Sequence, residues 1–217
     1  MINIEDCWYS AVCPEVCSNS CIRFLEMKYL VESSGLPESK WFPVKLDANS
    51  VDYNAYIRLA EIKQNILSHV ESGDNIYIYS TITGNGKTTW SIKLLLKYFD
   101  EVWAGNGFRC RGLFISVPAL LVKLKNFGVK DLEFESLKQL IPDVDLVVWD
   151  DIASTSMSSY DHSQLLSLVD QRILANKSNI FTGNLCGADM EKQLGVRLTS
   201  RVWNNSTCIE FNGGDKR

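Results

Sequence analysis

The feature that most constrains the fold is a β-favouring run, a glycine-containing loop and an amphipathic segment in direct succession. The run covers residues 75–80, is rich in Ile and Tyr, and ends at Ser80. After the loop, apolar residues recur at the i, i+3, i+4, i+7 spacing of a helix, at Ile92, Leu95, Leu96 and Phe99. This order predicts a strand, a phosphate-binding loop and a helix N-terminus, which together form a P-loop.

The residue types in the loop match the chemistry of polyphosphate binding. Gly84 and Gly86 let the backbone approach the phosphates, and the backbone N–H groups and the helix dipole attract them. Lys87 would reach the β- and γ-phosphates of ATP, and the Thr88 hydroxyl would ligate Mg²⁺. Thr81 stands where the first glycine of this motif is usual, and a positive φ there would be strained. The residues expected to bind the nucleotide are Gly84, Asn85, Gly86, Lys87, Thr88, Thr89 and, from a second motif, Asp150.

That second motif distinguishes a P-loop from an ordinary glycine turn. Residues 146–149 form an apolar run that ends in two acids, Asp150 and Asp151, with another predicted strand between it and the loop. An apolar strand ending in acids is the Walker B pattern. We expect Asp150 to hold Mg²⁺ and Asp151 to orient or deprotonate the attacking water.

Composition limits the possible partners and compartments. The 217 residues are 46% hydrophobic, enough for one core domain and a small appendage. The formal net charge of −4 argues against a generic nucleic-acid coat, so any DNA contact must be local or arise on assembly. No run of 18 apolar residues and no basic-then-apolar leader occurs. We therefore expect a cytoplasmic protein without a membrane partner.

The seven cysteines are unevenly distributed, with Cys7, Cys13, Cys17 and Cys21 close together near the N-terminus. In a cytosolic chain such a cluster indicates a metal more often than disulfides. On an unbroken helix Cys13 and Cys21 would lie about 12 Å apart, too far to share one ion. Either the helix breaks, for which Pro14 is suited, or the four thiols do not share a metal. We favour a zinc site of these four cysteines, with an iron–sulfur cluster or free thiols as alternatives.

The remaining pattern alternates predicted strands and helices. We expect further strands at residues 112–116, 179–182 and 207–211, and helices at residues 22–33, 53–70, 118–127, 161–175 and 188–194. Asn184 follows the strand at 179–182. An Asn there is usually a turn residue, but in this order of motifs it suits the sensor-1 role, contacting the γ-phosphate or its water. Two arginines, Arg197 and Arg201, come next.

This order of motifs resembles the AAA+ ATPases of the DnaC/DnaI helicase-loader group, which includes the IstB transposition helpers. The resemblance covers roughly residues 70–217. The segments that carry it are 113–118, 145–152, 170–172, 181–184 and 194–201. A cysteine-rich segment ahead of such an ATPase is similar to the loaders of Firmicutes and their phages.

The resemblance implies an α/β fold in which helices flank a five-stranded parallel sheet and nucleotide binds at the carboxyl ends of the strands. We expect residues 1–50 to form a Cys-rich module. We expect residues 51–217 to form the ATPase domain, without a C-terminal lid. The resemblance also implies ring or spiral assembly, with Arg201 as the arginine finger for a neighbour's ATP and Arg197 as a second candidate.

The expected function is ATP-dependent loading of a DnaB-type replicative helicase onto single-stranded DNA. The expected cofactors are ATP, Mg²⁺ and Zn²⁺. Two alternatives remain open. An IstB-like helper would activate a transposase, and an adaptor would bind nucleotide with little hydrolysis, for which Thr81 is the main support.

Overall fold

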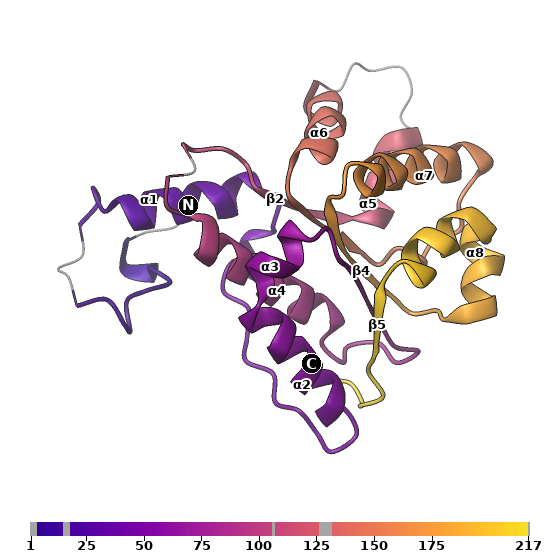
Figure 1. Cartoon of the computed structure of the whole chain (residues 1–217), viewed down its shortest axis with the longest axis horizontal. Helices are drawn as coiled ribbons and strands as arrows, with labels where there is room; N and C mark the ends of the chain where they lie inside the picture. The colour runs from indigo at the N-terminus through magenta and orange to yellow at the C-terminus, as the bar shows by residue number, and fades with distance from the viewer. Residues whose placement is uncertain (1–3, 15–17, 106, 126–131, 217) are drawn as a thin grey trace.

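A five-stranded parallel sheet forms the centre of the protein (Figure 1). The structure is a computed structural model that describes residues 4–14, 18–105, 107–125 and 132–216. The strand order is β2-β3-β4-β1-β5. The strands are β1 (Asn75–Tyr79), β2 (Gly112–Ser116), β3 (Leu146–Asp150), β4 (Ser178–Gly183) and β5 (Thr207–Glu210). The prediction of an α/β fold with a five-stranded parallel sheet is confirmed.

Side chains alternate between the two faces of the sheet and build two separate cores. In β1, Ile76 and Ile78 enter one core and Tyr77 enters the other. In β3, Val148 belongs to the first core and Trp149 to the second. All five side chains are fully buried. Helices must therefore cover both faces, as parallel sheets require.

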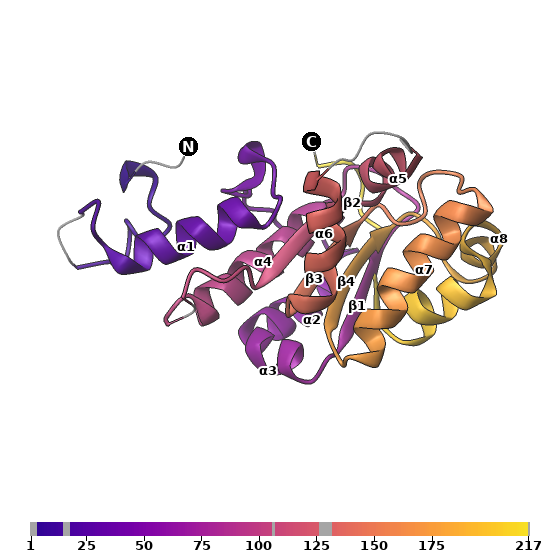
Figure 2. The same cartoon turned by 90° about the horizontal axis from the view of Figure 1, so that it is seen from above.

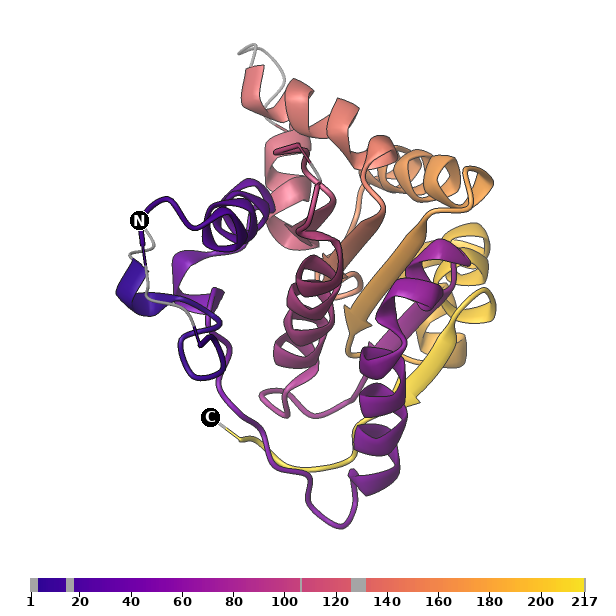
Figure 3. The same cartoon turned by 60° about the vertical axis from the view of Figure 1, so that its left-hand side comes forward.

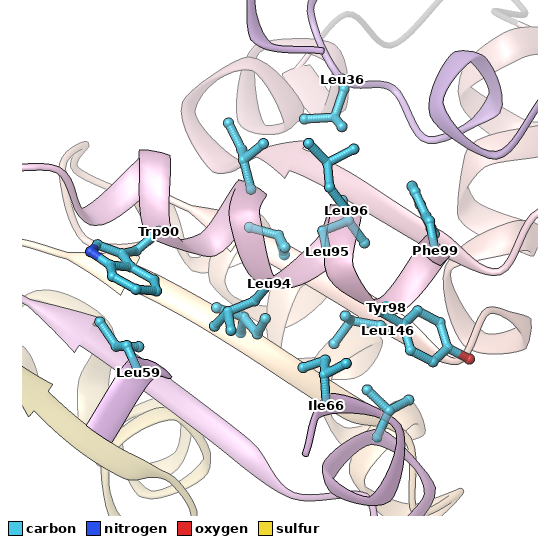
Figure 4. Close-up of a cluster of buried hydrophobic side chains, with 14 of the residues drawn as sticks. Leu36, Leu59, Ile66, Trp90, Leu94, Leu95, Leu96, Tyr98, Phe99 and Leu146 are labelled. Atoms are coloured by element: carbon cyan, nitrogen blue, oxygen red, sulfur yellow. The ribbon is translucent and has the colours of Figure 1, made fainter. Parts of the chain in front are cut away.

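The first face is covered by α2 (Tyr53–Gln64), α3 (Ile66–Glu71) and α4 (Lys87–Val102), and α1 (Ile22–Ser33) joins the same core from the outer side of α4. Leu94, Leu95 and Phe99 of α4 are fully buried and lie at the centre of this core (Figure 4). The single helix expected at 53–70 is two helices that meet at Asn65. The Asn65 side chain bonds the Glu61 carbonyl at 3.0 Å, a local bond that competes with helix continuation.

The second face is covered by α5 (Val117–Lys125), α6 (Leu132–Asp143), α7 (Ser159–Leu174) and α8 (Gly187–Thr199), with the π-helical turn η3 (Ser200–Asn204). The sequence did not predict α6, which contains Pro142 in its last turn. The predicted helix end at Phe127 lies outside the described residues. Across the described ranges, every helix is too short or too polar to cross a membrane.

Arg172 of α7 ties this layer to the sheet. Its side chain is fully buried, and its Nε donates to the Asn179 side chain at 2.7 Å. The two terminal nitrogens donate to four backbone carbonyls, those of Ile141, Val144, Asp145 and Ser178. A buried guanidinium is tolerated because acceptors surround it.

The N-terminal segment packs on the outer side of α4 (Figure 2). It contains the short helices η1 (Ile4–Asp6) and η2 (Glu38–Lys40) as well as α1. Phe24 and Met27 of α1 belong to the same core as α4. The Ser34 carbonyl accepts a hydrogen bond from the Phe114 N–H at 2.7 Å and so covers part of the exposed edge of β2. A domain boundary at residue 50 stays a prediction.

Candidate functional site: the phosphate-binding loop and the ends of β3 and β4

The loop between β1 and α4 has the geometry of a phosphate-binding turn. Gly86 precedes the first residue of α4 and has φ 104°, a conformation that favours glycine. A Cβ at this position would lie 2.4 Å from Cδ1 of Leu46, a residue of the linker between η2 and α2. The backbone conformation therefore requires glycine, and any side chain here would also have to displace the end of the Leu46 side chain. The first N–H groups of α4, which have no partner within the helix, point into this turn.

Ser80 organises the start of the loop. Its Oγ accepts hydrogen bonds from the Ile82 N–H at 3.0 Å and from the Asn85 side chain at 2.6 Å. Ser80 and Asn85 are fully buried. Thr81 does not have a positive φ. The unusual residue at this position is therefore accommodated without backbone strain.

Lys87 is held against the loop. Its Nζ donates to the Ile82 carbonyl at 2.9 Å and to the Asn85 side-chain oxygen at 3.3 Å, and the residue is 8% exposed. Both acceptors are neutral. A phosphate oxygen is a stronger partner for an ammonium group. These contacts therefore keep Lys87 beside the loop, and a bound phosphate could replace them.

The structure brings the P-loop threonine and the Walker B acid together. The Thr88 hydroxyl donates to Asp150 Oδ1 at 2.8 Å. Thr182 of the neighbouring strand β4 donates to the same oxygen at 2.7 Å. Thr182 was not among the residues predicted for the site. Its only signal was a hydroxyl near the end of a strand, and its place beside Asp150 depends on the register that pairs Trp149 with Phe181.

Burial raises the pKa of Asp150, and the hydrogen bonds from Thr182 and Thr88 offset only part of that effect. A cation beside the carboxylate would favour the ionised form instead. A threonine hydroxyl and a carboxylate are the hard oxygen donors that Mg²⁺ binds alongside nucleotide phosphates. Thr88 and Asp150 therefore fit a Mg²⁺ site, where the ion would neutralise charge on the phosphates.

Asp151 is the first residue beyond β3 and has φ 64°. Its N–H donates to the Thr182 hydroxyl at 2.9 Å, and the Ile152 N–H donates to the Thr182 carbonyl at 2.9 Å. A left-handed conformation is uncommon for a residue other than glycine, and such residues cluster at functional sites. The turn places Asp151 at the edge of the sheet where the P-loop lies.

Asn184 lies at the same edge and is half-buried, one residue beyond β4. The two arginines lie further along. Arg197 is exposed on α8, after a bend at Gly195. Arg201 in η3 forms an ion pair with Asp170 of α7 in the same chain. The roles predicted for Asn184, Arg197 and Arg201 stay predictions.

The cysteines do not converge in the described residues. Cys7, Cys13 and Cys21 are half-buried free thiols that pack against the apolar core shared by α1 and α4. No group of three or more potential metal ligands occurs in the ranges that the structure describes, and Cys17 lies outside them. The described part of the chain therefore does not support the predicted zinc site.

The C-terminal tail, residues 211–216, reaches back to the phosphate-binding loop (Figure 3). The Lys216 N–H donates to the Gly84 carbonyl at 2.9 Å. Asp52, fully buried at the start of α2, accepts from the backbone N–H groups of Asn212 and Gly213 at 2.8 and 2.9 Å. The Lys216 ammonium lies 3.4 Å from the second Asp52 oxygen. The tail thus connects the linker to the loop.

The sequence matches no protein-family model and no curated protein, but the fold is similar to those of known structures. The structure of the DnaC helicase loader superposes with a TM-score of 0.66 at 18% identity, covering 81% of this chain and 100% of that one. The structure of DnaI superposes with a TM-score of 0.64 at 19% identity, covering 81% of this chain and 94% of the DnaI chain. The structure of the replication initiator DnaA bound to AMPPCP and single-stranded DNA superposes with a TM-score of 0.57 at 19% identity. This likeness covers 85% of this chain and 50% of the DnaA chain.

These likenesses confirm, at the level of the fold, the predicted resemblance to the DnaC/DnaI loaders. The chain shares its α/β fold with these structures, and within this fold the predicted loop and the acidic strand end lie together.

Proposed function

We propose that this protein is an ATPase that loads a DnaB-type replicative helicase onto single-stranded DNA. The observation that carries the proposal is the bond between Thr88 and Asp150, which joins the phosphate-binding loop to the acidic strand end. It occurs in a fold that matches the whole of the DnaC loader chain. The likeness to DnaA bound to an ATP analogue and single-stranded DNA supports the same ligands here.

The mechanism follows from the residues at the edge of the sheet. The Gly84–Thr89 loop and the N-terminus of α4 bind the polyphosphate, and Lys87 exchanges its loop acceptors for phosphate oxygens. Thr88 and Asp150 would hold Mg²⁺, which would supply positive charge beside the phosphates. Asp151 accepts a proton from the attacking water, and Asn184 orients that water near the γ-phosphate.

Assembly completes the site. Charge that develops on the γ-phosphate during hydrolysis is usually neutralised by one more cation. Arg201 of a neighbouring subunit supplies it, after releasing its own Asp170, and Arg197 is the second candidate. ATP binding thus favours a ring or spiral of subunits.

The experiment is a reconstitution with the replicative helicase of the same host. Purified protein, helicase and ATP should form a complex on size-exclusion chromatography, and the helicase should unwind a forked substrate faster when the protein is present. The variant Lys87→Ala should lose the ATP-dependent part of both effects. Co-purification with a transposase instead of the helicase would contradict loading and support the IstB-like alternative. Complex formation with no ATP turnover would support the adaptor.

A further inference from the structure

A second concave surface lies outside the nucleotide site, on the side of α4 that faces away from the sheet. It is a groove of about 830 Å³ between the N-terminal segment, the linker to α2, and helices α2 and α4. Its edge includes Leu46, the residue that contacts Gly86 of the phosphate-binding loop. The groove is therefore next to the nucleotide site but separate from it.

Aromatic rings from several elements line the groove. Tyr53, at the start of α2, is 60% exposed. Trp90 of α4 packs edge-on against Tyr56 with 5.2 Å between the ring centroids. Trp8, from the N-terminal segment, stacks on Phe42 at 5.1 Å. One small ligand could use only one or two of these rings, so their spread favours a ligand that presents several planar groups.

The groove also contains lysines without carboxylate partners. Lys63 of α2 and Lys93 of α4 are half-buried, and neither forms an ion pair with any described residue. Lys45 of the linker pairs with Asp47 only at 4.0 Å, and both side chains are about nine-tenths exposed, so that pair is weak. At the other end, Arg23 and Lys97 are paired with Asp100 at 3.2 and 3.0 Å.

The lysine charges act on one another at Lys93. Burial lowers the pKa of Lys93, the charge of Lys63 lowers it further, and the charge of Asp47 offsets the smaller effect of Lys45. A cluster of this kind is unexpected in a chain whose formal net charge is −4. Anionic groups bound between the lysines would remove the repulsion, which indicates an anionic ligand.

Trp90 adds a polar group that lacks a partner. Its indole Nε1 is buried and has no hydrogen-bond partner among the described residues. Leaving a buried donor unpaired costs about 1–3 kcal/mol. A ligand acceptor that reached this nitrogen from the groove would recover that energy.

We propose that the groove formed by Trp8, Tyr53, Trp90, Lys45, Lys63 and Lys93 binds a segment of single-stranded nucleic acid. Bases stack on Tyr53 and Trp8, the buried Trp90 forms the floor of the groove, and phosphates contact the lysines, the combination that proteins use to bind single strands without sequence preference. The proposal rests on the proposed function only for the class of partner. It assigns the DNA contact to the outer side of α4.

The test is fluorescence anisotropy with a labelled oligonucleotide of twenty thymidines, with and without Mg-ATP, over a range of salt concentrations. The double variant Lys63→Gln/Lys93→Gln should weaken binding at least about tenfold at low salt. The slope of log binding constant against log salt concentration should also become shallower by about 1.4, since each phosphate contact on a single strand contributes about 0.7 to that slope. Tyr53→Ala should weaken binding roughly fivefold or more through lost stacking.

Matched controls change the same residue types outside the groove. Lys123→Gln/Lys192→Gln removes two positive charges from α5 and α8, and Phe108→Ala removes an aromatic ring that is 51% exposed. Both should bind the oligonucleotide within about twofold of the parent protein. Circular dichroism and ATP hydrolysis should match the parent for every variant, because none of these residues belongs to the nucleotide site.

Several results would overturn the groove assignment. They are no oligonucleotide binding by the parent protein, equal binding by Lys63→Gln/Lys93→Gln, an equal loss in the control variant, or full binding by Tyr53→Ala. Photocrosslinking an iododeoxyuridine oligonucleotide gives an independent readout and should label peptides from α2 or α4, whereas labelling confined to α5 or α6 would contradict it. The ATPase and helicase assays test the proposed function separately, so either proposal can fail alone.

Discussion

The hydroxyl of Thr88 donates a hydrogen bond to Asp150 over 2.8 Å, although the two residues come from different elements. Thr88 lies in the first turn of α4, and Asp150 ends β3. Their contact brings the predicted phosphate-binding loop and the acidic strand end together. Thr182 donates to the same carboxylate oxygen and aligns it from the other side.

Replacing Asp150 with Asn should stabilise the nucleotide-free protein and remove its response to Mg-ATP. Burial raises the pKa of Asp150, so the ionised carboxylate is disfavoured in the folded state. The wild-type protein should therefore lose stability as the pH rises through that raised pKa, and the Asn variant should not. Thermal unfolding at several pH values, with and without Mg-ATP, measures both effects. A variant that is less stable at pH 7 and still stabilised by Mg-ATP would contradict the assignment.

Asp151→Asn should bind ATP as the parent does and hydrolyse it about 10²-fold more slowly or worse, because a general base typically contributes that much. Asn tolerates the left-handed backbone at this position, so the fold should be unaffected. Single-turnover hydrolysis measures the rate, and equilibrium titration with labelled ATP measures binding. An unchanged rate would mean that another group activates the water.

Arg201→Ala distinguishes an arginine finger from a structural ion pair. If Arg201 acts on a neighbour's ATP, the variant should bind ATP normally, and hydrolysis should fall by about 10³-fold or more, as in GTPases that lack their arginine. The Arg201–Asp170 pair is partly exposed, so its loss should cost at most about 1 kcal/mol of stability.

Asp170→Ala is the matched control because it breaks the same ion pair and keeps the arginine. It should retain hydrolysis if Arg201 is a finger. Mixing Arg201→Ala with Asp151→Asn should then restore some activity, since one complete site can form at a mixed interface. Equal losses of activity in the two single variants, or no rescue in mixtures shown to co-assemble, would leave only the structural role.

Asp52→Ala should release the C-terminal tail from the phosphate-binding loop. The variant loses two hydrogen bonds from backbone N–H groups to a buried carboxylate, and we expect a loss of about 3 kcal/mol in the free energy of unfolding. Lys216→Met is the milder control, because the backbone N–H of residue 216 can still bond Gly84. Hydrogen exchange of residues 212–216 should accelerate strongly in Asp52→Ala and weakly in Lys216→Met. Unchanged exchange in both would show that these contacts do not fix the tail.

The positions of the strands, the loop and the acidic strand end could be predicted because each is encoded locally. The apolar strand runs, the Gly84–Thr89 loop and the acids Asp150 and Asp151 lie in short contiguous segments. The contact of Thr182 with Asp150 could not be predicted, since it depends on the register of two strands that are far apart in the sequence.

The contact of Asp52 with the C-terminal tail could not be predicted either, because the residues that it joins lie 160 positions apart in the sequence. Close spacing of the cysteines in the sequence predicted a shared metal ion, but Cys7, Cys13 and Cys21 pack against the apolar core, and Cys17 lies outside the described residues. Spacing alone does not fix where side chains point.

The most direct test of the nucleotide site is a titration with a fluorescent ATP analogue in the presence of Mg²⁺. The parent protein should bind it saturably. Lys87→Ala should bind at least about tenfold more weakly, because it loses charged hydrogen bonds to phosphate. The control is Lys97→Ala. Lys97 lies in the same helix but pairs with Asp100, so this variant should bind the analogue as the parent does. If Lys87→Ala binds the analogue as tightly as the parent, the loop is not the phosphate site.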